Sequence, residues 1–155
     1  MQISKKGLDL LKTWEQGPKG GFASIPYYCS SNKLTIGYGH VINLNESIKY
    51  PISEAKAEEL LKKDIAWAEK VVNTCVKVPL TQNQFNALVC FVFNIGVLRF
   101  KQSTLLSILN QGLYTEVPQQ LLRWNVATIG GVKKTLEGLT NRRKAEIALW
   151  NDLGN

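Results

Sequence analysis

Residues 27–40 read YYCSSNKLTIGYGH, and this stretch decides the fold of the first part of the chain. Residues that favour β-structure stand on both sides of a polar turn, Ser30–Lys33, which is typical of a β-hairpin. Two glycines near the end of the stretch allow the backbone to bend there. One residue is unexpected in such a hairpin, because Cys29 stands six residues ahead of Thr35 and both side chains can take part in chemistry.

The segment before this hairpin predicts a helix. Ser4 can cap its start. Gly17-Pro18 ends it, because proline disfavours helix at the preceding residue and lacks a backbone N–H. Glu15 is therefore expected in the last turn of the helix.

From Ser53 onward the pattern predicts only helices. Apolar residues recur there at helical spacing. The capping box Thr81-x-x-Gln84 opens a segment that is apolar almost all round, as expected for a buried central helix. Ser103 can cap a further helix. The expected helices lie near residues 53–73, 84–97, 103–112, 119–124 and 140–150.

These elements predict an α+β fold that is mostly α. A small N-terminal lobe with a short β-hairpin or sheet is expected at about residues 13–60. A long helix joins it to a larger helical lobe at about residues 75–155, which also takes the N-terminal helix. The length of 155 residues suits one domain.

The composition is that of a basic globular protein. Hydrophobic residues make up 45% of the chain and charged residues 20%. The net charge of +7 predicts attraction to polyanions, such as nucleic acid, anionic lipid or an acidic cell-wall polymer. Most basic side chains of residues 97–144 are expected on a solvated surface. They are Arg99, Lys101, Arg123, Lys133, Lys134, Arg142, Arg143 and Lys144.

The sequence predicts a protein made in a reducing cytoplasm. The N-terminus lacks the apolar run and the cleavage site of a signal peptide, and no stretch is apolar enough to span a membrane. Three cysteines are an odd number, which argues against a disulfide framework. Cys75 and Cys90 are expected in the core. One histidine and three scattered cysteines give no metal-ligand spacing, so neither a metal nor a cofactor is expected.

Glycosidic hydrolysis normally uses two carboxyl groups that flank the bond. Glu15 is the only carboxylate between Asp9 and Glu46, so the hairpin has no carboxylate pair beside it. From the residues alone, Glu15, Cys29 and Thr35 are potentially reactive side chains that no obvious rule joins.

Six segments, in this order, resemble the phage-type lysozymes, the endolysins of glycoside hydrolase family 24, which are muramidases that cut peptidoglycan. They are WEQG, YYC-x5-TIGYGH, QFNALVCFVFNIGV, RFKQSTLLSILNQG, RWN and GLTNRRKAEIALW. The resemblance runs from about Leu8 to Trp150. It implies one lysozyme-like catalytic domain over residues 1–155, without a separate wall-binding domain.

The resemblance also answers the question that Cys29 raises. The family's catalytic triad has the form Glu, then Asp or Cys, then Thr six residues later, and Glu15, Cys29 and Thr35 match it. Glu15 is implied as the general acid. A Cys29 thiolate could accept a proton or stabilise positive charge, although a free thiol of pKa about 8.5 is mostly protonated at neutral pH. Thirteen residues, Gln16 to Tyr28, separate Glu15 from Cys29. This spacing is longer than is usual in the family and leaves the cleft width open.

Three further residues are candidate substrate contacts. Phe93 and Asn94 lie where the family's central helix reaches the cleft. Phe93 can equally be a core residue, and Asn94 is the better candidate for a sugar contact. Ser103 can be a helix cap, a substrate contact or both.

Supporting roles are implied for three more residues. Arg142 is expected to hydrogen-bond the Glu15 carboxylate, with Arg143 as the second choice. His40 could act as an acid or base, but a structural role paired with Asp64 is the preferred interpretation.

The implied function is hydrolysis of the β-1,4 bond between N-acetylmuramic acid and N-acetylglucosamine, which lyses the bacterial host. A lytic transglycosylase on the same bond is the nearest alternative. A basic nucleic-acid-binding module is a different class, and no recognition motif or aromatic platform supports it. The expected protein is a monomer attracted to the anionic envelope. It would stay in the host cytoplasm until a separate pore-forming, holin-type protein lets it reach the periplasm.

Overall fold

The computed structural model describes residues 1–154. The chain forms helices and two small antiparallel sheets, which confirms the predicted α+β, mostly α fold. It divides into two compact units. One unit is Asp9–Trp67, and the other combines Met1–Leu8 with the chain from Ala68 on. No helix within residues 1–154 has both the length and the hydrophobicity needed to cross a bilayer.

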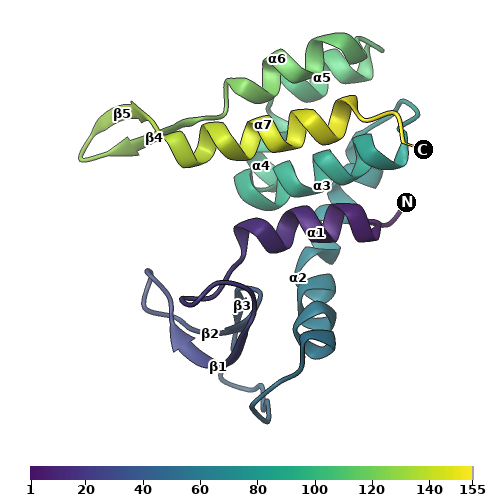
Figure 1. The fold of residues 1–155 in the computed structure, drawn as a ribbon. Coiled ribbons are helices and arrows are strands. Elements are labelled where there is room, and N and C mark those ends of the chain that lie inside the picture. Colours follow the sequence, from purple (N-terminus) through teal and green to yellow (C-terminus); the bar gives the residue numbers. More distant parts are fainter. Residues whose placement is uncertain (155) are drawn as a thin grey trace. The chain divides into compact units, whose positions relative to one another are not determined.

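The unit of residues 9–67 contains the predicted hairpin. Strands β1 (Ala23–Tyr28), β2 (Leu34–Gly37) and β3 (His40–Val41) form one antiparallel sheet in the order β1-β2-β3 (Figure 1). The turn between β1 and β2 is tight, because the Cys29 N–H donates to the Lys33 carbonyl at 3.0 Å. Thr35 of β2 lies opposite Tyr27 of β1. The tight turn therefore keeps Cys29, at its start, close to Thr35.

Two helices contribute to this unit. The first helix, α1 (Lys5–Trp14), begins directly after Ser4, as predicted, and α2 (Glu54–Cys75) follows the sheet. The boundaries between the two units fall within these helices. The apolar stripe predicted for α2 is confirmed. Its members in this unit are at most 3% exposed, and they are Ala57, Leu60, Leu61 and Ile65.

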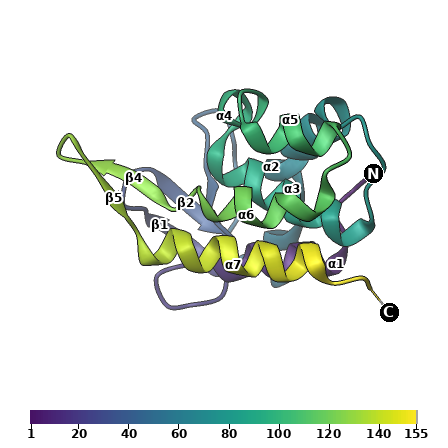
Figure 2. The same cartoon turned by 90° about the horizontal axis from the view of Figure 1, so that it is seen from above.

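The other unit is built around α3 (Gln82–Ile95). The predicted capping box is present, with the Thr81 side chain on the N–H of Gln84 and the Gln84 side chain on the N–H of Thr81. The helix is buried over most of its length, as expected for a central helix. The last helix, α7 (Glu137–Asn151), packs along it (Figures 1 and 2). The remaining helices are α4 (Val97–Lys101), α5 (Thr104–Asn110), a 3-10 turn (Tyr114–Glu116) and α6 (Val117–Leu122).

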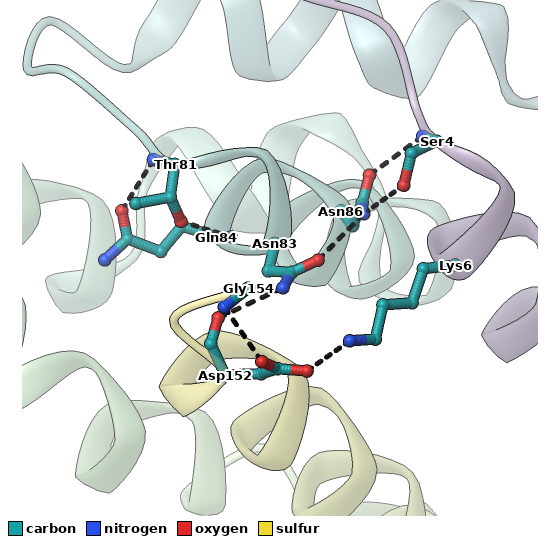
Figure 3. Close-up of polar contacts among 8 residues, drawn as sticks. All are labelled: Ser4, Lys6, Thr81, Asn83, Gln84, Asn86, Asp152 and Gly154. Carbon is teal, nitrogen blue, oxygen red and sulfur yellow. Dashed lines mark hydrogen bonds and ion pairs between the residues drawn. The ribbon is translucent and has the colours of Figure 1, made fainter.

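Side-chain amides of α3 hold both chain ends (Figure 3). The Asn86 amide donates to the Ser4 hydroxyl at 2.7 Å, and its oxygen accepts the Ser4 N–H at 3.0 Å. The Asn83 amide donates to the Asp152 carbonyl at 3.0 Å. Lys6 forms an ion pair with the Asp152 carboxylate. These contacts join the first and last turns of the chain to one helix.

The expectation of only helices after Ser53 is wrong in one place. Strands β4 (Val126–Ile129) and β5 (Val132–Thr135) form a hairpin that projects beyond the start of α7 (Figure 2). Gly130 and Gly131 make its two-residue turn with φ values of 57° and 79°. Two consecutive positive φ angles match the twist of a hairpin, and glycine adopts them without strain. The Gly-Gly pair between β-branched residues was the available signal.

Candidate active site

Glu15 lies at the end of α1, in the helical turn predicted for it. Its N–H donates to the Leu11 carbonyl at 3.0 Å, so the backbone is still helical at this point. The carboxylate faces the bend between β2 and β3, where a Cβ added to Gly39 would lie 2.8 Å from Glu15 Oε2. Gly39 also has a φ of +75°. The positive φ favours glycine at this position, and the absence of a Cβ leaves room for the Glu15 carboxylate.

Cys29 begins the turn between β1 and β2 and is partly exposed. Its Sγ lies 3.2 Å from the Ser31 hydroxyl oxygen. Hydrogen bonding from the Ser31 side chain, then from the Lys33 backbone and the Thr35 side chain, lowers the pKa of Cys29 to about 6. An ordinary cysteine would be mostly protonated at pH 7, but this one is mostly thiolate. The thiolate reading of the triad is thus the one that the local geometry supports.

Thr35 is close to Cys29 through a shared acceptor. Its hydroxyl donates to the Lys33 carbonyl at 2.8 Å, and the same carbonyl accepts the Cys29 N–H at 3.0 Å. The side chain is only 2% exposed. Because the Thr35 hydroxyl donates its hydrogen bond to the Lys33 carbonyl, the lone pairs of its oxygen are left to accept a hydrogen bond from another group.

Tyr27 lies close enough to both Glu15 and Cys29 to be affected by their charges. Burial raises the pKa of Tyr27, and the negative charges of Cys29 and Glu15 raise it further. Both acidic groups therefore act on the same phenol. Glu15, Cys29 and Thr35 all lie in the unit of residues 9–67, and their role as a catalytic triad stays a prediction.

The long segment between Glu15 and Cys29 is folded back on itself. The Gly17 N–H donates to the Gly21 carbonyl at 2.8 Å, which closes a short loop. The rest of the segment forms β1, from Ala23 to Tyr28. The thirteen residues between Glu15 and Cys29 thus form a closed turn followed by the strand β1.

His40 forms the predicted contact with Asp64. Its Nδ1 lies 2.9 Å from an Asp64 carboxylate oxygen, and its Nε2 lies 2.9 Å from a Glu46 carboxylate oxygen. The second partner, Glu46, was missed by sequence reasoning, because it lies in an irregular segment without periodicity. Both ring nitrogens are engaged and the residue is only 7% exposed. This geometry favours the structural interpretation of His40.

The same contacts control the ionisation of His40. Burial lowers the pKa of its imidazole, but the hydrogen bonds and charges of Glu46 and Asp64 outweigh burial and raise it. The His40 hydrogen bond in turn lowers the pKa of Glu46. Burial raises the pKa of Asp64 despite its bond to His40. The pKa values of the two carboxyl groups that contact His40 are therefore shifted in opposite directions.

We expect His40→Gln to lower the free energy of unfolding by about 1.5–3 kcal/mol at pH near 5.5, and by less at pH near 8.5. A group whose pKa is raised on folding stabilises the fold fully below its unfolded pKa. That contribution is lost as the pH rises through the folded pKa. Urea denaturation of both proteins at the two pH values measures the difference. An equal loss at both pH values would show that the charged imidazolium of His40 does not stabilise the fold through Glu46 and Asp64. Glu46→Gln should reproduce part of the loss of stability at pH near 5.5.

In the other unit, Arg143 is the centre of a buried polar cluster. Its Nη2 donates to Asn94 Oδ1 at 2.8 Å and lies 2.6 Å from Glu146 Oε1. Its Nη1 donates to the Trp124 carbonyl at 3.4 Å. Arg143 and Glu146 are both fully buried. Sequence reasoning did not single out Glu146, although its position three residues after Arg143 is the spacing of a helical ion pair.

The predicted solvated surface of basic residues is confirmed for six of its eight members, which are exposed. Arg142 and Arg143 are the exceptions, with 9% and 0% exposure. Arg143 packs on α3, with its guanidinium over the Phe91 ring and hydrogen-bonded to Asn94, which explains its burial. The predicted bond between Arg142 and Glu15 stays a prediction.

The candidate substrate contacts lie in different environments. Asn94 is exposed and Phe93 is half-buried. Ser103 caps α5, since its hydroxyl accepts the Leu106 N–H at 3.1 Å and donates to the Phe100 carbonyl at 2.7 Å. The cap interpretation of Ser103 is confirmed, and its contact with substrate stays a prediction.

The other two cysteines differ from Cys29. Cys90 is fully buried, as predicted, and burial raises its pKa, whereas Cys75 is only partly buried. Among residues 1–154, no three His, Cys, Asp or Glu side chains gather in a way that could hold a metal ion.

Comparison with known proteins places this geometry in a family. The family model described as Phage lysozyme matches residues 18–146. The chain is 43% identical to an endolysin of Acyrthosiphon pisum secondary endosymbiont phage 1, over 97% of this chain and 98% of that protein. It is 38% identical to an endolysin of Bacillus phage PZA, where 97% of this chain matches 55% of the relative.

A solved structure supports the same assignment. An endolysin from Escherichia coli O157:H7 phage FAHEc1 superposes with a TM-score of 0.84 at 35% identity, covering 98% of this chain and 94% of that one. The carboxylate, thiol and hydroxyl of the sheet unit thus occur in a chain whose sequence and fold both match phage endolysins. The chain belongs to the phage lysozyme family.

Proposed function

We propose that Glu15, Cys29 and Thr35 carry out the reaction of this endolysin, a glycoside hydrolase that cuts the β-1,4 bond between N-acetylmuramic acid and N-acetylglucosamine in peptidoglycan. The observation that carries the proposal is the geometry of the sheet unit. A carboxyl group faces the bend at Gly39, and the Cys29 backbone N–H and the Thr35 hydroxyl both donate to the Lys33 carbonyl.

Glu15 acts as the general acid in this proposal. Its protonated carboxyl group donates a proton to the glycosidic oxygen as the bond to the leaving sugar breaks. The absence of a side chain at Gly39 leaves the space that the Glu15 carboxylate occupies beside the bend between β2 and β3. A general acid must be aimed at one oxygen, and misplacement near 1 Å can lower a rate by about 10²-fold.

Cys29 and Thr35 act on the other reactant, the attacking water. The Thr35 oxygen accepts a hydrogen bond from this water, because its own hydroxyl donates to the Lys33 carbonyl. The Cys29 thiolate takes up the one proton that the water loses, while the other stays on the new hydroxyl of the sugar, or it stabilises the positive charge that develops on the sugar. A pKa of about 6 leaves the thiol ionised at neutral pH. Arg142, as the group that orients Glu15, and Asn94, Phe93 and Ser103, as substrate contacts, complete the proposal.

Mass spectrometry of digested peptidoglycan tests the reaction itself. Hydrolysis should release fragments that end in reducing N-acetylmuramic acid. A lytic transglycosylase would release 1,6-anhydro ends and consume no water. A predominance of anhydro ends would overturn the hydrolytic proposal and leave Thr35 without its role in holding water.

We expect Cys29→Ser to lower the rate of lysis at pH 7 by about 10²-fold, and Cys29→Asp to retain a substantial part of it. Aspartate is ionised at this pH and accepts hydrogen bonds, whereas a serine hydroxyl stays neutral. The measurement is the fall in turbidity of bacterial cells whose outer layer has been permeabilised. Cys75→Ser is the matched control and should lyse at the wild-type rate. Full activity of Cys29→Ser would return Cys29 to a purely structural role.

Release from the producing cell is a separate part of the proposal. Expression of the chain without a pore-forming, holin-type protein should leave the culture intact until the inner membrane is permeabilised with chloroform. Spontaneous lysis at full expression would argue against a separate release protein.

A further inference from the structure

Backbone hydrogen bonds fix the turn that carries Cys29. The Asn32 N–H donates to the Cys29 carbonyl at 2.8 Å, and the Cys29 N–H donates to the Lys33 carbonyl at 3.0 Å. Asn32 has a left-handed φ of 58°, a conformation that asparagine tolerates. These bonds fix the backbone on both sides of Ser31 and bring its hydroxyl oxygen to 3.2 Å from Cys29 Sγ.

Two hydroxyl groups lie near the sulfur, but they are not equivalent. The proton of the Thr35 hydroxyl goes to the Lys33 carbonyl at 2.8 Å. A hydroxyl has only one proton to donate. Ser31 has an exposed side chain, and its hydroxyl is bonded to the sulfur. The Thr35 side chain also lowers the pKa of Cys29, but less than the Ser31 side chain does. Ser31 is therefore the main hydroxyl donor to the thiolate.

We propose that Ser31 is a positioning residue for the catalytic thiol: its hydroxyl donates to Cys29 Sγ and holds the sulfur ionised and in one orientation. This inference rests on the proposed role of Cys29. Hydrogen bonds to an ionised group are stronger than neutral ones, so the contact favours the thiolate over the thiol. The effect on the pKa of Cys29 supports this, because the hydrogen bond of the Ser31 side chain lowers that pKa more than any other contact does.

The first test measures ionisation without requiring hydrolysis. The rate of alkylation by iodoacetamide is followed against pH in a Cys75→Ala background, and Cys90 is left in place because it is fully buried. The unmodified turn should give a midpoint of about 6. Ser31→Ala should move the midpoint up by about one unit, which lowers reactivity at pH near 6 by about fivefold.

Two further variants separate the hydroxyl from the turn. Ser31→Thr keeps a hydroxyl at the same place and should restore the low midpoint. Ser30→Ala removes an exposed hydroxyl from the adjacent position and should change nothing. An unchanged midpoint in Ser31→Ala, or an equal shift in Ser30→Ala, would overturn the proposal.

The second test asks whether the bond matters for the reaction. The acidic limb of the pH–rate profile for lysis should move up with the alkylation midpoint in Ser31→Ala, while the rate at about pH 8 stays near the wild-type value. A shift in alkylation without a shift in the rate profile would overturn the positioning role. Alkylation of the thiol does not depend on glycosidic cleavage. Failure of the proposed function would therefore appear as absent lysis in every variant, with the alkylation result intact.

Discussion

Glu15→Gln should abolish lysis, with a rate at least about 10²–10⁴-fold below that of the wild type. Glutamine has nearly the same shape as glutamate, but its amide cannot supply a proton to the glycosidic oxygen. The substitution suits this site because a side chain of the same size fits the space beside Gly39, where even a Cβ added to residue 39 would lie 2.8 Å from Glu15 Oε2. The measurement is turbidity loss, paired with mass spectrometry of the released fragments.

The control for this prediction must match the loss of one negative charge. Glu116 is exposed at the end of the 3-10 turn, and Glu116→Gln changes the net charge of +7 by the same amount. The control should lyse cells normally. The free energy of unfolding of both variants should lie within about 0.5 kcal/mol of that of the wild type. A folded Glu15→Gln protein with more than about a tenth of the wild-type rate would exclude Glu15 as the general acid.

Arg143→Met should lower the free energy of unfolding by about 3–5 kcal/mol. The reason is the partner that it leaves behind, since Glu146 is fully buried and Arg143 lies 2.6 Å from its carboxylate. An unpaired carboxylate in the interior is far more costly than the pair is favourable. Asn94 also loses its 2.8 Å hydrogen bond. Urea denaturation at pH 7 measures the loss.

The pH dependence of this variant gives a sharper test. Burial raises the pKa of Glu146 to about 7, although the charges of Arg143 and Arg142 lower it. A carboxyl whose pKa is raised on folding binds more protons in the folded state, so stability falls as the pH rises from its unfolded pKa to its folded one. Removing the Arg143 charge raises the folded pKa further. The destabilisation should therefore be larger at pH near 8 than at pH near 5.

Two companion variants separate the pair from its surroundings. Arg143→Met combined with Glu146→Leu should recover much of the lost stability, because apolar side chains of similar size can replace a buried ion pair. Lys144→Met, at an exposed position of the same helix, should change stability by no more than about 0.5 kcal/mol. A double variant as unstable as Arg143→Met would show that packing, and not charge, sets the loss.

The sequence by itself determined those features that depend on neighbours along the chain. The Thr81 and Gln84 capping box, the end of α1 near Gly17-Pro18 and the β1–β2 hairpin are local choices of backbone conformation, and the residues involved lie within a few positions of one another. The six-residue spacing of Cys29 and Thr35 across a tight turn belongs to the same class. Even the missed β4–β5 hairpin had a local signal in Gly130-Gly131.

Only the tertiary structure decided the ionisation and pairing of the polar groups. The His40 imidazole contacts Glu46, which was not predicted, as well as the expected Asp64, and Arg143 of α7 contacts Asn94 of α3. Periodicity predicts which face of a helix is buried. A charged residue on that face is still predicted to be exposed, because the sequence does not show the partner that would allow its burial. Even within the local β1–β2 turn, the spacing of Cys29 and Ser31 predicts that they are near neighbours but not the 3.2 Å contact between the sulfur and the hydroxyl oxygen. Electrostatic energies change steeply with distance and burial, and both are properties of the folded chain.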